Sequence, residues 1–268
     1  MKNDTYIPKI IHFVWVGTQK KPDLVLKCIE TWKKFCPDYQ IMEWGNDSLK
    51  DINNLYVSQA YENKKWAFVS DYLRLYALEK YGGFYCDSDL EITNPLEEFR
   101  GFRFVTGYEK YNNVYSPVTA LMGAEPHNQI IRDLLEEYAQ IPFIQNGLMD
   151  QTTNVTRISK YFEKKFGLKK PYDGSILTRL DENSMIYPSY YFCTPEDGKK
   201  NYSIHHFSGS WLDAYSRKNL CSFGKFKIAR FKKRRKSAGN ILPLMANETK
   251  LLSFSFGIRK KICLIREK

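Results

Sequence analysis

The sequence predicts an α/β protein with a mixed, mostly parallel central sheet flanked by helices. Its 268 residues, 43% of them hydrophobic, are enough for one large domain of this class. The first strand is expected over 7–16, where an almost continuous apolar run is typical of a strand buried on both faces. A helix pattern over 22–35 and a strand pattern over 39–44 complete a strand, helix and strand unit.

The later elements continue this alternation. Residues 66–81 are the clearest predicted helix, because apolar side chains recur there at every third or fourth position. Gly82 and Gly83 end the helix, since glycine adopts the left-handed cap without strain, and a short strand follows over 84–86. Further strands are expected at 103–108, 118–122 and 203–207, and further helices at 128–139 and 151–166.

Positive charge is concentrated at the C-terminal end. The net charge is +11, yet residues 217–268 contain 16 Lys and Arg and only two acidic residues. The remainder has 25 basic and 28 acidic residues, so it is not a basic nucleic-acid platform. We expect a main domain over 1–217 and a basic, amphipathic helical extension over 218–268.

The cysteines and the N-terminal residues indicate the compartment. None of the six cysteines forms a C-x-x-C pair, and no apolar run approaches the roughly 18 residues of a membrane span. Residues 1–17 lack the charged start and the cleavage site of a signal peptide. We therefore expect free thiols in a reducing cytosol.

Asp87 and Asp89 are candidate metal ligands at the end of the strand over 84–86. Two carboxylates one residue apart converge on one divalent cation if the backbone turns between them. Mg²⁺ and Mn²⁺ favour oxygen ligands and keep positions for substrate phosphates. D-x-D alone is a weak signal, but in α/β sheets ligands bind at the carboxyl ends of strands.

Asp71 and Arg74 are three residues apart on the helix over 66–81 and project from one side of it. As a surface ion pair they would contribute little. Because their helix leads straight into the acidic triplet, Arg74 is instead placed to face a phosphate. Asp71 is placed to accept hydrogen bonds from sugar hydroxyls.

Two further segments have both structural and functional interpretations. The Trp15 ring either belongs to the core or stacks on a nucleobase at the mouth of the first strand, while His12 is expected to pack in that strand. Asp150, Gln151 and Asn154 either face a sugar or begin a helix capped by Asp150.

The segment 205–211 combines two histidines with small residues and a tryptophan. Strand histidines are usually structural, but an imidazole here is also suited to completing a metal shell. Ser208, Ser210 and the Trp211 indole N–H are donors suited to a diphosphate. Other chemistries are disfavoured, because the sequence contains no G-x-S-x-G, H-E-x-x-H, P-loop or G-x-G-x-x-G motif.

Three stretches together resemble the family 32 glycosyltransferases, a DXD-containing group that includes bacterial capsule enzymes, and the glucosyltransferase domain of large clostridial toxins. They are IPKIIHFVWVG at 7–17, FVSDYLRLYALEKYGGFYCDSDLEI at 68–92 and YSIHHFSGSW at 202–211. The middle stretch is the most specific, because S-D-x-x-R, Gly-Gly and D-x-D rarely occur in this order by chance. The resemblance covers 7–215, loosely over 110–200.

The resemblance implies a GT-A type fold and a retaining hexosyltransferase. The enzyme would move a hexose or N-acetylhexosamine from a nucleotide sugar, UDP favoured over GDP, to a glycan acceptor in capsular or cell-surface polysaccharide synthesis. It would use Mn²⁺ or Mg²⁺ held by Asp87, Asp89 and His206, with His205 as the alternative to His206. No covalent catalyst is implied.

The resemblance also implies roles at the matching positions. Trp15 would stack on the base, Asp71 and Arg74 would hold the donor sugar and ribose, and Asp87 would touch the ribose or a metal-bound water. Trp211 would close over the diphosphate. The remaining expected substrate contacts are Val14, Gly83, Tyr85, Ser208 and Ser210.

The basic extension leaves several partners open. Its core over 225–236 interleaves cations with Phe and Ile, which suits an amphipathic helix on an anionic membrane and predicts peripheral attachment to the inner face of the cell membrane. A lipid-linked glycan acceptor would fit such attachment. The alternatives are a solvated tail, a nucleic-acid-binding protein, a sugar-binding module without turnover, and another metal-dependent phosphoryl or nucleotidyl transferase.

Overall fold

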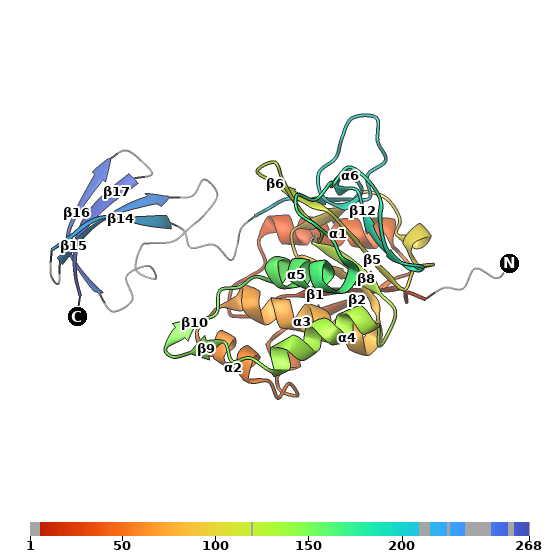
Figure 1. Ribbon diagram of the computed structural model, residues 1–268, viewed down its shortest axis with the longest axis horizontal. Helices are drawn as coiled ribbons and strands as arrows, with labels where there is room; N and C mark the ends of the chain where they lie inside the picture. Colours follow the sequence, from red (N-terminus) through yellow and green to blue (C-terminus); the bar gives the residue numbers. More distant parts are fainter. Residues whose placement is uncertain are drawn as a thin grey trace. The chain divides into compact units, whose positions relative to one another are not determined.

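The computed structural model describes residues 6–118, 120–208, 215–223, 226–233, 248–256 and 260–267. They divide into two units, Met1–His206 and Phe207–Lys268, which are described separately below (Figure 1).

A seven-stranded mixed sheet forms the centre of the first unit, in the order β11-β12-β5-β8-β3-β1-β2. Its strands are β1 (Ile10–Val14), β2 (Gln40–Trp44), β3 (Gly83–Cys86), β5 (Phe104–Gly107), β8 (Leu121–Ala124), β11 (Thr178–Asp181) and β12 (Ser184–Tyr187). All run in one direction except β8 and β11, which confirms the predicted mixed, mostly parallel sheet. The carboxyl ends of β1, β3 and β5 therefore meet at one edge.

Helices cover both faces of this sheet (Figure 1). They are α1 (Asp23–Phe35), α2 (Leu55–Glu62), α3 (Trp66–Tyr81), α4 (Gln129–Ala139), α5 (Asn154–Phe166) and the short α6 (Ser189–Phe192). Because strand side chains alternate, Tyr85 packs with α2 to α5, while Phe84 and Cys86 pack with α1 and α6. Nearly every position of β1 and β3 is therefore buried, as the apolar run of the first strand predicted.

Shorter elements complete the first unit. They are η1 (Asn46–Leu49), η2 (Glu97–Phe99), and the antiparallel pairs β4 (Leu90–Ile92) with β13 (Ser203–His205), β6 (Glu109–Tyr111) with β7 (Val114–Ser116), and β9 (Ile144–Gln145) with β10 (Leu148–Met149). Each strand and helix predicted above for the main domain is present. The N-cap of α5 is Thr153, however, and not Asp150.

The turn between α3 and β3 requires glycine. Gly82 and Gly83 have φ angles of 62° and 99°, in the left-handed region. A Cβ on Gly83 would lie 2.7 Å from the Ile10 carbonyl oxygen, so the backbone of β1 leaves no room for a side chain. This close approach lets the chain pass directly from α3 into the middle of the sheet and brings Asp87 to its carboxyl edge.

The second unit corrects the expectation of a helical extension. Its described residues form an antiparallel sheet in the order β14-β15-β17-β16. The strands are β14 (Tyr215–Phe223), β15 (Phe226–Lys233), β16 (Glu248–Phe256) and β17 (Lys260–Glu267). Apolar residues and cations alternate in Phe226-Lys227-Ile228, which is the period of a strand rather than of a helix. Among the described residues, no helix is long and apolar enough to cross a membrane.

His12 is a structural histidine, as predicted. It is fully buried on β1, where its Nε2 donates to the Gly82 carbonyl (2.7 Å) and its Nδ1 accepts from Trp44 Nε1 (3.1 Å). These partners assign a neutral ring with the proton on Nε2. Burial lowers the pKa of His12 to about 4, and the bond to Gly82 opposes this only in part.

We predict that His12 makes the first unit less stable in acid. Because its folded pKa lies below the ordinary value, the unfolded chain gains the proton first, and stability is lost as pH falls from about 6.5 toward 4. The expected loss between pH 7 and 4 is about 3 kcal/mol. Urea unfolding at several pH values, compared between wild type and His12→Gln, should show this dependence in the wild type alone. Parallel pH curves for the two proteins would contradict the prediction.

Candidate functional site

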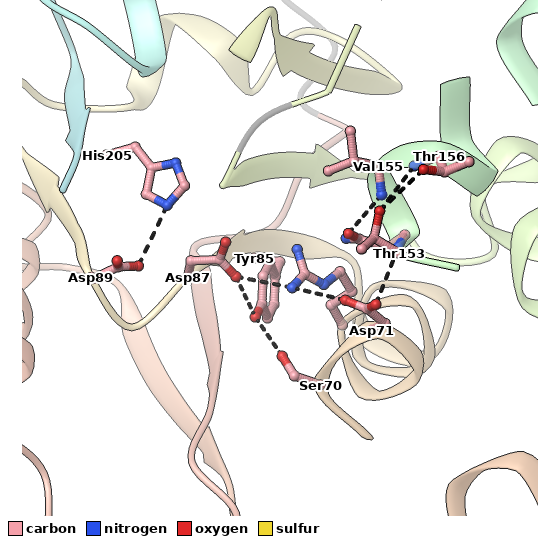
Figure 2. Close-up of polar contacts among 11 residues, drawn as sticks. Ser70, Asp71, Tyr85, Asp87, Asp89, Thr153, Val155, Thr156 and His205 are labelled. Atoms are coloured by element: carbon pink, nitrogen blue, oxygen red, sulfur yellow. Dashed lines mark hydrogen bonds and ion pairs between the residues drawn. The ribbon is translucent and has the colours of Figure 1, made fainter. Parts of the chain in front are cut away.

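A polar site lies at the carboxyl edge of the sheet, where β3 ends at Cys86 and Asp87 follows. The Asp87 amide donates to the Ala120 carbonyl (2.9 Å), and the Leu90 amide donates back to the Asp87 carbonyl (2.9 Å). The backbone therefore turns between Asp87 and Asp89, as two carboxylates facing one cation require. Figure 2 shows Asp89 and His205 on one side of Asp87, and Asp71 on the other.

One half of the candidate site centres on Arg74. Its side chain is only 8% exposed, and one guanidinium nitrogen lies 3.0 Å from Asp87 Oδ1 and 3.4 Å from Asp71 Oδ1. The guanidinium also lies over the Tyr85 ring, 4.4 Å from its centroid. The Tyr85 hydroxyl donates to Asp87 (2.9 Å) and contacts Ser70 Oγ (3.1 Å). Asp71 and Arg74 are thus a buried pair and not a surface ion pair.

Asp71 is held between two positive partners. Beside Arg74, the backbone amide of Asn154 at the start of α5 donates to Asp71 Oδ2 (3.1 Å). Burial raises the pKa of Asp71 to about 6, and the charge of Arg74 and the Asn154 N–H oppose this rise. The carboxylate is therefore ionised near neutral pH and able to accept hydrogen bonds from hydroxyl groups.

The other half, a candidate metal site, brings together Asp87, Asp89 and His205. One ligand atom of each lies within 4.8 Å of the others. This spacing and the oxygen and imidazole donors are compatible with the ligands of one divalent ion. His205 Nε2 lies 3.6 Å from Asp89 Oδ1, and its Nδ1 lies 3.3 Å from Glu109 Oε2. Carboxylate partners of this kind orient a metal-binding imidazole.

The electrostatics of this cluster also fit a cation. Burial lowers the pKa of His205, but contacts with Asp89, Cys193 and Glu109 outweigh burial and raise it to about 12. A negative potential strong enough to hold a proton there attracts a divalent ion, which would displace that proton. The residues present therefore fit a hard divalent metal.

His206, preferred from the sequence as the third ligand, is turned away from the carboxylates. Its Nε2 lies 2.9 Å from Glu91 Oε2, and its ring lines a cavity with α1 residues such as Lys27 and Thr31. His205, the last residue of β13, lies beside Asp89, whereas the next residue, His206, lies beside Glu91. The register of β13 on β4, with His205 opposite Leu90, gives that position to His205.

The other residues expected to contact substrate differ in burial and in position. Val14 is buried, and Trp15 is half-buried at the end of β1, where its Nε1 donates to the Gln19 carbonyl (2.9 Å). Gly83 is buried against β1, and Ser208 is half-buried beyond β13. Ser210 and Trp211 lie outside the described residues.

The two weaker candidates near the start of α5, Asp150 and Asn154, make different contacts. Asp150 pairs with Arg157, and Asn154 reaches Asp71 through its backbone amide rather than through its side chain.

Sequence reasoning missed Arg157, Ser70 and Glu109. Glu109 follows β5 with no motif around it, and only the parallel order of β3 and β5 would have indicated its place at the site edge.

Comparison with known proteins gives one match in sequence. Residues 22–105 match the family model described as "Glycosyltransferase sugar-binding region containing DXD motif". No curated protein matches the chain.

Several solved structures resemble the chain at low identity. "PaToxG Glycosyltransferase" is 18% identical over 60% of this chain and 70% of its own, with a TM-score of 0.43. A "glycosyltransferase involved in the glycosylation of the major capsid of PBCV-1" is 12% identical over 76% and 95%, with a TM-score of 0.43. The ligand-free "glycosyltransferase domain from the YGT toxin" is 12% identical over 64% and 71%, with a TM-score of 0.32.

The family match contains the buried Asp71 and Arg74 pair and the Asp87 and Asp89 turn, and it ends before Glu109 and His205. Residues 22–105 of this chain are therefore similar to the sugar-binding region of DXD-containing glycosyltransferases.

Proposed function

We propose that the protein transfers a hexose or N-acetylhexosamine from a nucleotide sugar to a glycan acceptor, with retention of configuration and with a divalent ion. The observation that carries this proposal is the junction at Asp87. This one carboxylate belongs both to the cluster of metal-ligand type and to the buried Arg74 pair. In a nucleotide sugar the diphosphate is bonded directly to the sugar, so a site for it needs a cation for the diphosphate next to polar groups for the sugar.

Different residues of the site would have different roles in such a transfer. A divalent ion held by Asp87, Asp89 and His205 would neutralise the leaving diphosphate. Arg74, fixed on the Tyr85 ring, presents a charge that does not reorganise during the reaction. Asp71 accepts hydrogen bonds from the sugar hydroxyls and so orients the ring.

Retention needs no covalent catalyst in this proposal. If the acceptor attacks from the side of the leaving group, a diphosphate oxygen takes the acceptor proton as the glycosidic bond to the phosphate breaks. The resemblance to family 32 enzymes favours UDP as the nucleotide and cell-surface or capsular polysaccharide as the product.

The basic C-terminal residues favour attachment of this enzyme to an anionic membrane surface on the cytoplasmic side. Residues 217–268 carry 16 Lys and Arg against two acidic residues, and cations near such a surface contribute about 1 kcal/mol each. A lipid-linked glycan is the acceptor that such attachment would bring near. Binding of nucleic acid by the same residues is the alternative.

Removal of the metal or of Asp89 should abolish turnover of the donor. We expect one donor in a panel of UDP- and GDP-sugars to release nucleoside diphosphate with Mn²⁺ and not with EDTA. Asp89→Asn should lower this rate about 100-fold, because it removes a charge that holds the ion against the leaving group. Release that persists in EDTA, or in Asp89→Asn, would contradict the proposal.

The two neighbouring histidines provide a matched pair of variants. His205→Ala should weaken Mn²⁺ binding at least about tenfold, since His205 alone faces the carboxylates. His206→Ala should leave Mn²⁺ affinity unchanged, because its ring contacts Glu91 instead. Titration of Mn²⁺ followed by electron paramagnetic resonance measures both affinities without donor. Equal effects of the two substitutions would argue against the assignment of His205.

Attachment to membranes should depend on the basic residues. We expect the full chain to sediment with vesicles containing phosphatidylserine and to be released as salt rises, whereas residues 1–217 should stay in solution. Vesicles of phosphatidylcholine alone are the control. Binding to RNA or DNA with no binding to anionic vesicles would favour the nucleic-acid alternative.

A further inference from the structure

We propose that Arg157 is a positioning residue for the donor sugar. It holds the start of α5 in place, so that the Asn154 amide donates to Asp71 and fixes the carboxylate that receives the sugar. This inference rests on the proposed function, because it names a residue that prepares the same site.

The contact that Arg157 would maintain joins two distant segments. The Asn154 amide and Asp71 Oδ2 are 3.1 Å apart, although α3 and α5 are far apart in sequence. Asn154 and Asp71 are only 7% and 6% exposed. The first amides of a helix have no partner within the helix and carry the positive end of its dipole. The start of α5 is thus a fixed donor that neutralises and orients Asp71.

Arg157 closes the segment that presents this amide. It lies in the first turn of α5, and its guanidinium pairs with the carboxylate of Asp150. Asp150 also accepts a hydrogen bond from the Thr152 amide (2.9 Å), and Thr153 Oγ1 accepts one from the Thr156 amide (3.4 Å). The Asp150–Arg157 pair therefore ties the two ends of the segment 150–157 together, with Asn154 between them.

Two tyrosine rings pack against the guanidinium of Arg157. Its carbon lies 5.2 Å from the ring centroid of Tyr138 on α4 and 5.9 Å from that of Tyr56 on α2. The two rings pack edge to face with centroids 4.9 Å apart, and both side chains are fully buried. Arg157 thereby ties the loop before α5 to two other helices.

The surroundings of Arg157 are unusual for a purely structural contact. Its Nε and the hydroxyls of Tyr56 and Tyr138 are buried without hydrogen-bond partners among the described residues. Buried polar atoms left unpaired destabilise a fold, and apolar side chains would pack there at lower cost. Together with Arg74, Arg157 also favours the ionised form of Asp71.

The proposed separation of sugar contacts from nucleotide contacts predicts which ligand Arg157 affects. Asp71 faces the sugar in the proposed complex, whereas the nucleotide and diphosphate are held by Trp15, Asp87, Asp89 and His205. Loss of Arg157 should therefore weaken binding of a nucleotide sugar and leave binding of the matching nucleoside diphosphate unchanged. A general loss of structure would weaken both.

The test uses the full chain with Mn²⁺ and calorimetric titration of UDP-glucose, UDP-galactose, UDP-N-acetylglucosamine and GDP-mannose, with UDP and GDP alongside. Arg157→Gln should weaken the preferred nucleotide sugar about tenfold, or 1.4 kcal/mol, and change its diphosphate less than about twofold. Arg157→Lys should restore part of the loss, because it keeps the charge but not the planar fork. Lys160→Gln, which removes an exposed charge from the same helix, is the matched control.

Two results of the binding experiment would overturn the inference. One is unchanged affinity of Arg157→Gln for the nucleotide sugar, and the other is an equal loss for sugar and diphosphate. Hydrogen exchange at the Asn154 amide tests the positioning without any donor. It should accelerate in Arg157→Gln and not in Lys160→Gln, and unchanged exchange would also refute the role. Wild-type protein that binds no nucleotide sugar would count against the proposed function, while the exchange experiment would still decide on Arg157.

Discussion

The site depends on the burial of one charge, the guanidinium of Arg74. Its side chain is 8% exposed, and an uncompensated charge at such a position costs several kcal/mol. Asp71 and Asp87 supply the compensation from one helix and from the end of the adjacent strand. Because Arg74 draws Asp87 toward α3, the position of the acidic turn is set by the helix before it. The Gly82–Gly83 turn makes this possible, since it leads α3 into β3 with no intervening loop.

The sequence predicted the part of the site that is encoded locally. Asp71, Arg74, Asp87 and Asp89 lie within one helix, turn and strand, so spacing and the Gly-Gly break were enough to bring them together. Glu109 and Arg157 reach the same edge from other parts of the chain, through strand order and the packing of α5. Their places depend on pairings between segments that no local pattern specifies. The strands and helices predicted for the first unit were found for the same reason, because each has an apolar pattern of its own, whereas α2, β11, β12 and α6 were not predicted.

Both corrections arose where a local pattern had two interpretations. Residues 225–236 were interpreted as an amphipathic helix because cations interleave there with Phe and Ile, but Phe226–Lys233 is a strand, β15, that pairs on both sides with β14 and β17. His205 is the last residue of β13 and His206 follows it, and the two rings contact different carboxylates, those of Asp89 and Glu91. Only the register against β4 decides between them, and the register is a tertiary property.

The pairing of β4 with β13 joins the residues of the candidate metal site through the backbone. The His206 amide donates to the Asp89 carbonyl (3.2 Å), so the strand that carries His205 is bonded to the acidic turn itself. His205 is then fixed by backbone pairing below and by the Glu109 carboxylate beside it. An imidazole held on two sides loses little freedom when an ion arrives. Asp87 is held in the same way by Arg74 and Tyr85, and Asp89 lies beside His205.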